Sequence, residues 1–393
     1  MFAAITAAEH LGDAGEVTVY EATAHPLAKV LVSGGGRCNV THACFEPREL
    51  VTRYPRGGRE LLGAFHRWQP KDTVEWFASR GVALKTEADG RMFPTTDRSA
   101  TIAECLLGAA EKAGVHLVLR QGVKSAHGTE GRFTLELASG AGVPVDRLLI
   151  ATGGNRSSAG FAIASGFGHT VTPLVPSLFT FSVDDPRLRD LAGLSVAEAE
   201  VWVEGTKLRE RGPLLITHAG LSGPAVIKLS AWGARAFAER DYTFTVSVNF
   251  WGRGGVDAAA AVLGSFRAAN PRKHVASINP FEIPQRLWER LVQAAGLSAG
   301  APWTGVANAS IASLAAQVCA APFNVTGKSA FKEEFVTCGG VALGEVDFKT
   351  LQSRKRSGLF FAGEVLDIDG VTGGFNFQSA WTTGWLSGVA MAS

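Results

Sequence analysis

The sequence predicts an α/β fold in which one domain is split by a large insert, and three observations support this. A helical segment at residues 2–11 precedes a short buried strand at residues 16–22, which is the order found in a βαβ unit. A buried strand, a glycine loop and a helix fill residues 357–390 in a similar glycine-rich style. Between them, from about residue 175, short strands at intervals take over.

Composition and charge limit the classes of protein to which the chain can belong. It has 393 residues, of which 46% are hydrophobic and 19% are charged, so we expect a globular protein with an ample core. Its 38 basic and 36 acidic residues give a net charge of +2, which gives no reason to expect a nucleic-acid partner. We expect neither a signal peptide nor a membrane span, because no apolar run is long enough.

The cysteines indicate a reducing compartment. They are scattered, form no CxxC pair and have no metal-ligand spacing, so we expect free thiols, no bound metal and a cytoplasmic location. The five are Cys38, Cys44, Cys105, Cys319 and Cys338.

Hydrophobic periodicity predicts the elements of the first half of the chain. The predicted helices cover residues 2–11, 59–80 and 97–112. Gly12 and Gly114 are expected to end the first and third of these, and Asp97 to cap the start of the third. The predicted strands cover residues 16–22, 90–95, 115–128, 131–139 and 145–154.

The insert is predicted at residues 174–334, so the first domain would consist of residues 1–173 and 335–393. Residues 174–255 contain "SLFTFSV", "AEVWVE", "LLITHAG" and "YTFTVSVNFW", which are typical of an antiparallel, barrel-like structure. Residues 256–334 are expected to be mostly helical, with "VDAAAAVLGSFRAAN", "PQRLWERLVQAAG" and "ASIASLAAQVC".

Glu21 ends the first predicted strand, where a dinucleotide-binding βαβ unit places an acid that binds the adenosine ribose. That acid follows the glycine fingerprint by about 20 residues. Counting back puts the last fingerprint glycine at or just before Met1, so we expect the first strand and the G-x-G-x-x-G loop to be missing. Either the start of translation was misassigned or the loop was lost. A solvated acid at a strand end is the other interpretation of Glu21.

Two further glycine-rich stretches are typical of cofactor binding. In "LFFAGEVLDIDGVTGGFNFQSAW", an apolar strand ends at Gly363 and Glu364, where two-part flavin enzymes place an acid that binds the ribityl chain. Gly370–Gly374 then open a helix, whose positive N-terminal end would stabilise negative charge on a reduced flavin. The alternative is a strand–turn–helix unit whose glycines allow close packing. Ala151–Gly154, at the end of "LLIATGG", would let the backbone approach a cofactor.

These motifs, in this order, resemble one family over essentially the whole chain. The segments are "KVLVSGGGRCNVTH", "GRMFPTTDRSAT", "ATGG", "THAGLSGPAV", "VTCGGVALGEV" and "GLFFAGEVLDIDGVTGGFNFQSAWTTG". They are similar to those of the BaiN-like, aminoacetone-oxidase-like family of FAD-dependent NAD(P) oxidoreductases. The resemblance implies a glutathione-reductase-like Rossmann domain that binds FAD and is split by a large insert.

The resemblance also implies a set of cofactor-binding residues. Glu21 would bind the adenosine ribose, Lys29 would lie near the flavin or the pyrophosphate, and the backbone of Val123 would face the adenine. The flavin would be lined by Ser33, Gly34, Gly35, Gly36, Arg37, Cys38 and Asn39. Further contacts would come from Ala151, Thr152, Gly153, Gly154, Gly363, Glu364, Gly370, Gly373, Gly374, Phe375, Asn376 and Phe377.

Two residues are candidates for catalysis, and each has a structural alternative. His218 could act as an acid or base toward the substrate because imidazole titrates near neutral pH, or it could be a turn histidine bonded to backbone. Arg91 could border the substrate pocket or belong to a structural turn. Cys38 has no CxxC partner, so we expect it to pack beside the cofactor without reacting. Asp367 and Asp369 are expected to cap the loop before the last helix.

The predicted function is FAD-dependent oxidoreduction, in which hydride moves between the flavin and a small organic substrate or NAD(P)H, the latter docking transiently. A reductase of an activated double bond and a small-amine oxidase that produces peroxide both remain open. A flavin-free binding or scaffold protein is the alternative from another class. We expect a small-molecule partner, and no nucleic acid or membrane. Without the fingerprint loop, the chain as written is expected to bind FAD weakly and to fold poorly. The sequence does not indicate the oligomeric state.

Overall fold

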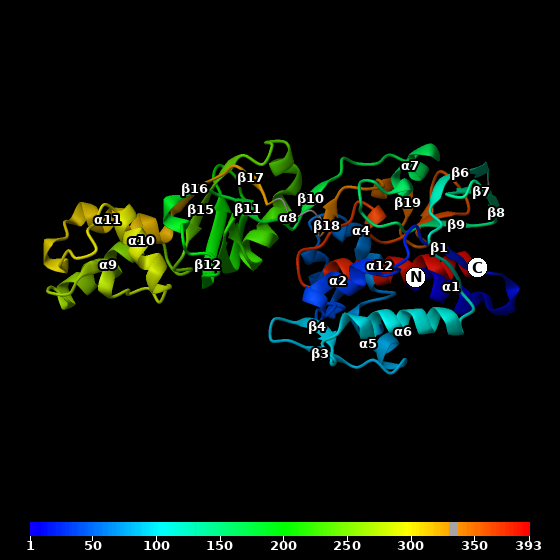
Figure 1. Cartoon of the computed structure of the whole chain (residues 1–393), viewed down its shortest axis with the longest axis horizontal. Helices are drawn as coiled ribbons and strands as arrows, with labels where there is room; N and C mark the ends of the chain where they lie inside the picture. The colour runs from blue at the N-terminus through cyan, green and yellow to red at the C-terminus, as the bar shows by residue number, and fades with distance from the viewer. Residues whose placement is uncertain (130, 330–335) are drawn as a thin grey trace. The chain divides into compact units, whose positions relative to one another are not determined.

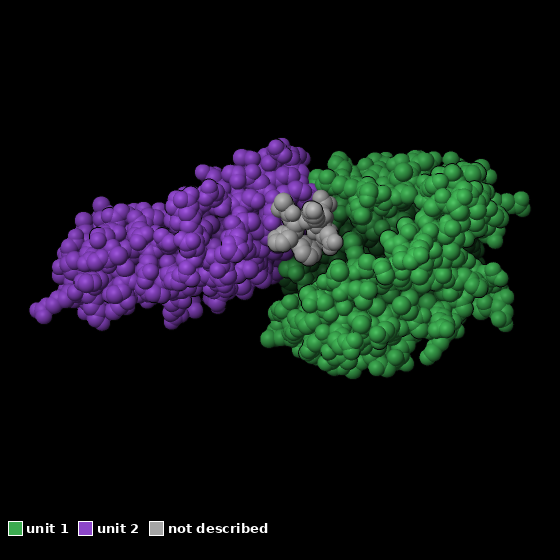
Figure 2. Space-filling model, viewed as in Figure 1, with its two compact units in different colours: residues 1–175, 336–393 green, residues 176–335 purple. Residues whose placement is uncertain are grey.

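The computed structural model separates the chain into two compact units (Figure 2). The residues that it describes are 1–129, 131–329 and 336–393. Unit 1 consists of Met1–Val175 and Val336–Ser393, and unit 2 of Pro176–Phe335. The sequence predicts domain boundaries after residues 173 and 334, and the two units meet after residues 175 and 335.

Unit 1 is an α/β structure whose elements are labelled in Figure 1. Its helices are α1 (Phe2–Leu11), α2 (Ala28–Gly36), α3 (Pro47–Leu50), α4 (Gly58–Phe65), α5 (Pro70–Ala78), α6 (Ser99–Lys112), α7 (Ala159–Gly166) and α12 (Phe375–Ala392). Its strands are β1 (Thr18–Tyr20), β2 (Thr41–His42), β3 (Leu84–Thr86), β4 (Arg91–Pro94), β5 (His116–Val118), β6 (Val123–Thr129), β7 (Arg132–Leu137), β8 (Gly142–Val145), β9 (Leu148–Ile150), β18 (Val336–Cys338), β19 (Val346–Asp347), β20 (Gln352–Ser353) and β21 (Leu359–Phe361).

Two parallel pairs of strands carry the sequence motifs of unit 1. In the first pair β1 lies beside β5, with Thr18 opposite His116. In the second pair β9 lies beside β21, with Leu148 opposite Leu359. Among the described residues, the two pairs belong to separate sheets. Ligands of parallel α/β sheets bind beyond the carboxyl ends of the strands, so the segments that follow β1, β9 and β21 are where a cofactor is expected.

Helices α1 and α12 form the centre of unit 1 and pack against each other (Figure 1). Small residues allow this approach, because a side chain at Gly388 would lie 2.6 Å from the carbonyl oxygen of Ala3. Around the two helices lies a buried apolar cluster, in which the ring of Phe2 contacts those of Trp68 and Trp381. The helix predicted at residues 2–11 is confirmed in full.

Unit 2 contains a mixed sheet-and-helix core. Its strands are β11 (Phe181–Ser182), β12 (Ser195–Val203), β13 (Arg209–Thr217), β14 (Gly220–Ser222), β15 (Phe244–Asn249), β16 (Ala321–Val325) and β17 (Gly327–Lys328), and β10 (Val175–Ser177) leads into them. Its helices are α8 (Pro224–Ala238), α9 (Val256–Ala269), α10 (Gln285–Ala294) and α11 (Asn308–Cys319). Trp288 and Trp303 are fully buried in the core, and the rings of Phe237 and Phe244 stack at 4.2 Å.

The predicted barrel in the insert is replaced by an open sheet. In the described part of the chain the strand order is β16-β15-β12-β13-β14-β11-β17, so the sheet has β16 and β17 at its edges. The three helical segments predicted within residues 256–334 are confirmed as α9, α10 and α11, and the sequence missed the two short strands β16 and β17 that follow them. β16 returns to the sheet because Ala321 pairs with Val248 of β15 in an antiparallel ladder. The residues of β16 alternate between buried and exposed, but a strand of five residues is short, and the sequence does not show that its partner is β15.

Two details of the predicted helices in unit 1 are also different. The single helix expected at residues 59–80 is two helices, because Pro70 starts α5 at its first position, where its missing N–H costs nothing. Asp97 does not cap α6, whose N-cap residue is Arg98. Asp97 instead has a left-handed φ of 54° and pairs with Lys85. In residues 1–129, 131–329 and 336–393, no helix has both the length and the apolar character needed to cross a bilayer.

Candidate functional site

The glycine loop at the end of α2 presents bare backbone. Ser33 leaves helical geometry with a ψ of 153°, and Gly34, Gly35 and Gly36 follow with φ of 57°, 68° and 83°. These left-handed angles favour glycine. A Cβ atom at Gly35 or Gly36 would meet nothing within 4 Å, so this stretch of backbone is open to a ligand. Just before it, the apolar side chain of Val32 is 64% exposed.

Asn39 joins the glycine loop to the start of α12. With its amide oriented to satisfy its neighbours, the side-chain nitrogen donates to the carbonyl oxygens of Met92 and Thr41 at 3.3 and 3.0 Å. The side-chain oxygen accepts from the backbone nitrogen of Gly374 at 2.9 Å. Glycine is required at Gly374, which has a φ of 92° and where a Cβ would lie 2.5 Å from the carbonyl oxygen of Thr41. The two glycine motifs therefore form one site.

The start of α12 is arranged as an anion-binding helix end. Gly374 is the N-cap residue and provides no side chain to bond the first N–H groups. Those groups and the helix dipole favour negative charge in front of them. The preceding loop is held in shape by Asn376, whose side chain both accepts from the nitrogen and donates to the carbonyl of Gly370, at 2.8 and 2.9 Å.

Three contacts fasten this loop to residues 53–56. Arg56 forms a two-point ion pair with Asp369, whose carboxylate is fully buried, and one of its bonds is 2.5 Å long. The hydroxyl of Tyr54 donates to the carbonyl of Phe375 at 2.7 Å, and burial raises the pKa of this tyrosine well above its usual value. The third contact is from the nitrogen of Val371 to the carbonyl of Arg53, at 2.9 Å.

The sequence did not indicate these fastening residues. Arg56 and Tyr54 lie outside the glycine motifs, and their partners are more than 300 residues away along the chain. Asp369, expected to cap the loop, holds it by an ion pair. One feature of the sequence could have indicated such a contact. The segment "DIDG" contains two acids between apolar segments, and an acid that becomes buried there needs a charged or hydrogen-bonding partner.

The sequence reasoning also assigned no role to His42. Its ring stacks on that of Phe375 at 4.7 Å, directly beside the start of α12. Its Nε2 atom lies 3.1 Å from the carbonyl oxygen of Asp89, which assigns the proton to Nε2 in the neutral ring. Burial lowers the pKa of His42, so the imidazole is neutral at physiological pH.

Glu364 brings a third motif to the site. Its carboxylate pairs with the ammonium group of Lys29, and it follows β21 as the sequence predicts. The same carboxylate lies 3.8 Å from the position of a Cβ at Gly153. A Cβ at Gly154 would lie 3.5 Å from the Cβ of Glu364. The "ATGG" segment after β9 and the Gly363-Glu364 segment after β21 are therefore neighbours.

A separate group of residues gathers around Glu21. Its carboxylate accepts bonds from both the backbone nitrogen and the hydroxyl of Thr23, each at 2.8 Å. The backbone of Glu21 bonds to Val118 and Gln121 at 2.9 Å each, so Glu21 lies beside the chain that leads into Val123. The structure thus puts together the two residues that the resemblance assigns to the adenosine end of FAD.

Other predicted residues are buried in the core or held in ion pairs. Cys38 is fully buried in the apolar cluster of α1 and α6, so its side chain packs in the core and does not face a ligand. Burial raises the pKa of its thiol to about 11, so it is protonated at neutral pH. Arg37 pairs with Glu87 at 2.6 Å. Arg91 pairs with Glu87 and Asp89 at 3.0 and 2.7 Å.

Three further predicted residues lie in different surroundings. Phe377 stacks on Trp381 at 5.5 Å. Thr152 packs so closely on Gly160 that no larger residue fits there. His218 is exposed in the turn between β13 and β14 of unit 2. Clusters of three or more potential metal ligands are absent from the residues that the structure describes.

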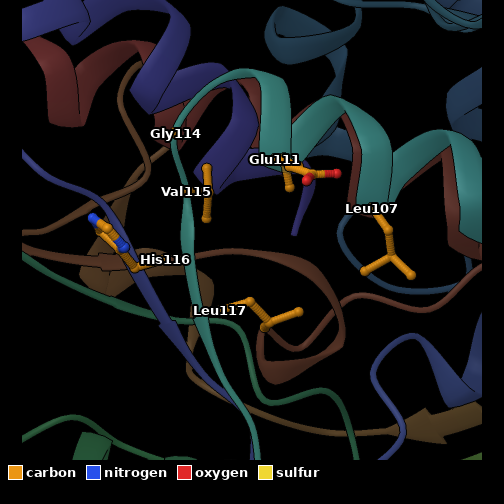
Figure 3. Close-up of a pocket in the computed structure, with 7 residues that line it drawn as sticks. Leu107, Glu111, Gly114, Val115, His116 and Leu117 are labelled. Carbon is orange, nitrogen blue, oxygen red and sulfur yellow. The ribbon is translucent and has the colours of Figure 1, made fainter.

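A hollow of about 390 Å³ lies away from this site (Figure 3). It opens between the end of α6, with Leu107 and Glu111, and the start of β5, with His116 and Leu117. His116 pairs with Thr18, the first residue of β1, whereas Glu21 follows the last residue of that strand. The hollow is therefore at the amino ends of the strands, and the candidate site is at their carboxyl ends.

Comparison with known proteins assigns the chain to a family. Residues 1–390 match the family described as "HI0933-like protein Rossmann domain". The chain belongs to this family. This match confirms the fold class and the family resemblance predicted from the sequence, and it assigns a Rossmann domain to the HI0933-like chain.

This HI0933-like protein is similar to named enzymes along most of its length, and two of them illustrate the likeness. It is 32% identical over 373 residues to a "Ribosomal RNA dihydrouridine synthase" of Escherichia coli, and the alignment covers 92% of this chain and 88% of that protein. It is 29% identical over 401 residues to a "3-dehydro-bile acid delta(4,6)-reductase" of Clostridium scindens, and the alignment covers 99% of this chain and 96% of that protein.

Solved structures share its fold. A 3-ketosteroid-delta4-(5alpha)-dehydrogenase from Rhodococcus jostii RHA1 aligns with a TM-score of 0.50 at 14% identity, over 100% of this chain and 94% of that one. A quinol fumarate reductase of E. coli aligns with a TM-score of 0.50 at 13% identity, over 100% of this chain and 68% of that one. At these identities the likeness concerns the fold alone.

The residues of the HI0933-like chain fit FAD. The open glycines Gly35 and Gly36 and the exposed Val32 provide bare backbone and apolar surface for a flat ring. The start of α12 offers N–H groups to the electron-rich edge of that ring. Carboxylates at Glu364 and Glu21 are acceptors for the hydroxyl groups of the ribityl chain and the ribose.

Proposed function

We propose that this protein is a flavin-dependent reductase that saturates a carbon–carbon double bond conjugated to a carbonyl, and that its substrate is a uridine in ribosomal RNA. The observation that supports the substrate is the 32% identity to a ribosomal RNA dihydrouridine synthase along 92% of this chain. Because the alignment also covers 88% of that relative, it includes both units of this chain.

The names of the two relatives point to a common chemistry. Uridine becomes dihydrouridine when its C5–C6 double bond, which is conjugated to the C4 carbonyl, gains two hydrogens. A 3-dehydro steroid with a delta-4 double bond contains the same unit, an alkene next to a ketone. In both cases hydride adds to the carbon remote from the carbonyl and a proton adds to the neighbouring carbon. We infer that this reaction class extends to the present chain.

The electrons are proposed to come from NAD(P)H. Bound FAD supplies the chemistry that accepts hydride from one molecule and delivers it to another. The net reaction is uridine, NAD(P)H and one proton giving dihydrouridine and NAD(P)⁺, which balances in atoms and charge. It needs no protein nucleophile, which agrees with the buried, protonated thiol of Cys38.

The chain's own groups would orient the cofactor and stabilise negative charge on it. The N–H groups at the start of α12, held by Asn39, favour negative charge at the nearby ring edge. Hydroxyl groups of a ligand can donate hydrogen bonds to the carboxylate of Glu364 and accept them from the ammonium group of Lys29. His42, neutral and stacked on Phe375, adds no charge that would compete with this helix end.

The test uses protein loaded with FAD, NADH or NADPH, and an unmodified ribosomal RNA transcript. The RNA is digested to nucleosides, and mass spectrometry measures the gain of two hydrogens on uridine. Dihydrouridine that depends on both FAD and NAD(P)H supports the proposal. Rapid NAD(P)H-dependent reduction of a steroid enone, with none of the RNA, would overturn the assignment of the substrate.

A small-molecule enone is the second candidate substrate. The full-length match to the bile-acid reductase, 99% of this chain against 96% of that protein, favours it. A parallel reaction contains a small amine and oxygen without NAD(P)H, and its peroxide is measured, because an amine oxidase would produce peroxide there. That outcome would contradict both reductase assignments.

A further inference from the structure

A short segment beside the candidate site combines cations with an exposed aromatic ring. We define the basic rim as residues 45–59, which include α3, a short 3-10 turn and the start of α4. The contacts of Arg53, Tyr54 and Arg56 described above fasten this segment to the loop before α12. The basic rim therefore has a fixed place next to the helix end at which the flavin ring is expected.

The acids of the basic rim are engaged locally. Glu46 caps α3 by accepting from the backbone nitrogen of Arg48 at 3.4 Å, and Glu49 lies 3.4 Å from the guanidinium of Arg53. Arg48 and Arg59 are exposed, and within the described ranges neither forms an ion pair. Two guanidinium groups thus face solvent beside the site. Guanidinium forks suit phosphate oxygens geometrically.

Phe45 supplies the aromatic part of the basic rim. Its side chain is 46% exposed, although a phenylalanine is more often buried. It follows Cys44, which is buried, and lies three residues after His42, which packs against the start of α12. Exposed aromatic rings next to cations form the platforms on which unpaired bases stack in single-stranded RNA.

We propose that the basic rim binds the RNA strand that carries the target uridine. Arg48 and Arg59 contact phosphates, and Phe45 stacks on a base next to the uridine. The inference rests on the proposed function, since it supplies the contacts that an RNA substrate needs outside the flavin pocket. An enzyme that acts on a base must take it from the stack, so its neighbours need a new stacking partner.

The first experiment measures binding of a short, fluorescently labelled, uridine-containing single-stranded RNA to the FAD-loaded protein by anisotropy. The variants are Phe45→Ala and the double variant Arg48→Ala/Arg59→Ala. We expect each to weaken binding by about tenfold, as the loss of one stacked base or two phosphate contacts does. For the double variant, the slope of log affinity against log salt should fall by about 1.4, which is about 0.7 for each phosphate.

The matched control is Arg272→Ala/Lys273→Ala, which removes two exposed cations from unit 2. This control should bind RNA as the unaltered protein does. Flavin absorbance near 450 nm per protein chain should be the same in all variants, which shows that the rim variants are folded and loaded. Unchanged RNA affinity of the rim variants, or an equal loss in the control, would overturn the proposal.

The proposal and the function on which it rests fail in different ways. If the unaltered protein neither binds the RNA nor reduces its uridine, the proposed function is wrong. If it reduces uridine and the rim variants do so with the same KM, only the assignment of the RNA surface is wrong. A raised KM for RNA with an unchanged rate at saturation would support the basic rim as a binding surface.

Discussion

The two ends of the candidate cofactor site are built in different ways. At the flavin end, Asn39 and Gly374, and likewise Arg56 and Asp369, are contacts between residues far apart in the chain, and the Asp369 carboxylate is fully buried. At the adenosine end, Glu21 is half-buried and its carboxylate bonds to Thr23, only two residues away. The flavin end is part of the folded core, whereas the adenosine end is a local turn on a strand.

This difference indicates where the stability of unit 1 and the binding of the cofactor depend on the same contacts. A change at the flavin end should alter the stability of unit 1 and the properties of the flavin together, because the same bonds serve both. A change at the adenosine end should alter affinity for the cofactor and leave stability alone. The four predictions below test this distinction, from the largest expected effect to the smallest.

The largest effect is expected from Asp369→Ala. It leaves the guanidinium of Arg56 without its buried partner, and breaking a buried pair in this way costs about 3–5 kcal/mol. Urea unfolding should show that loss, and the purified variant should carry less FAD. A loss within 0.5 kcal/mol, as is typical of a surface change, would contradict the assignment.

The matched control for this prediction is Asp146→Asn, an exposed acid in the turn before β9. It should leave stability and flavin content unchanged. The double variant Arg56→Met/Asp369→Leu separates the two roles of the ion pair. Apolar replacement of both partners should recover most of the stability that the single variant loses, since no charge is then buried. If flavin content also recovers, the pair has no positioning role.

Asn39→Ala is expected to have the next largest effect. It removes the acceptor for the Gly374 nitrogen and two donated bonds, which should cost about 1–3 kcal/mol of stability. The helix end is then less firmly placed, so the midpoint potential of the bound flavin should become more negative. Spectroelectrochemistry measures this shift. Asn39→Asp keeps the acceptor and should retain more of the stability than the alanine variant.

Glu21→Gln sharpens the comparison at the adenosine end. We expect FAD affinity to fall about tenfold, the lower limit for losing a hydrogen bond to a charged group. Binding of FMN, which has no adenosine, should be unchanged, and so should the urea midpoint. Fluorescence titration with both flavins measures the ratio. An equal loss for FAD and FMN would place Glu21 elsewhere than at the ribose.

The smallest effect is expected at Cys38. A raised thiol pKa means that the thiolate, which is the reactive form, appears only as pH rises toward about 11. At pH 8 iodoacetamide should therefore modify Cys38 in urea and leave it intact in the folded protein, as mass mapping can show. Turnover per bound flavin should be the same in Cys38→Ala. Loss of that turnover would give the thiol a role in catalysis.

The sequence predicted the parts of the site that local chemistry dictates. Glycines at positive φ, a strand that ends in an acid and a helix that opens on glycine are visible as short patterns, and the structure brings Lys29, Glu364 and Gly153 together. Arg56 could not be predicted, because its role depends on a partner 313 residues away. β16 was missed for the same reason, since it forms the edge of the sheet by pairing with β15, which is more than 70 residues earlier in the chain.

Net charge predicts no nucleic-acid partner, whereas the substrate that we propose is an RNA. A value of +2 averaged over 393 residues argues against a nucleic-acid partner, and this was the expectation from the sequence. The average does not reveal how acids and bases pair. In the basic rim the acids are held by a helix start and by Arg53, so Arg48 and Arg59 face solvent. A proposal of RNA binding thus rests on local pairing in the folded chain.

The close packing of α1 on α12 acts as a fixed spacer. Ala3, near the start of α1, meets α12 at Gly384, nine residues after that helix begins at Phe375, or roughly 14 Å along its axis. Because the two helices touch backbone to backbone, the distance between their electropositive ends cannot relax independently. A bound molecule that reaches from one end to the other is therefore selected by its length as well as by its chemical groups.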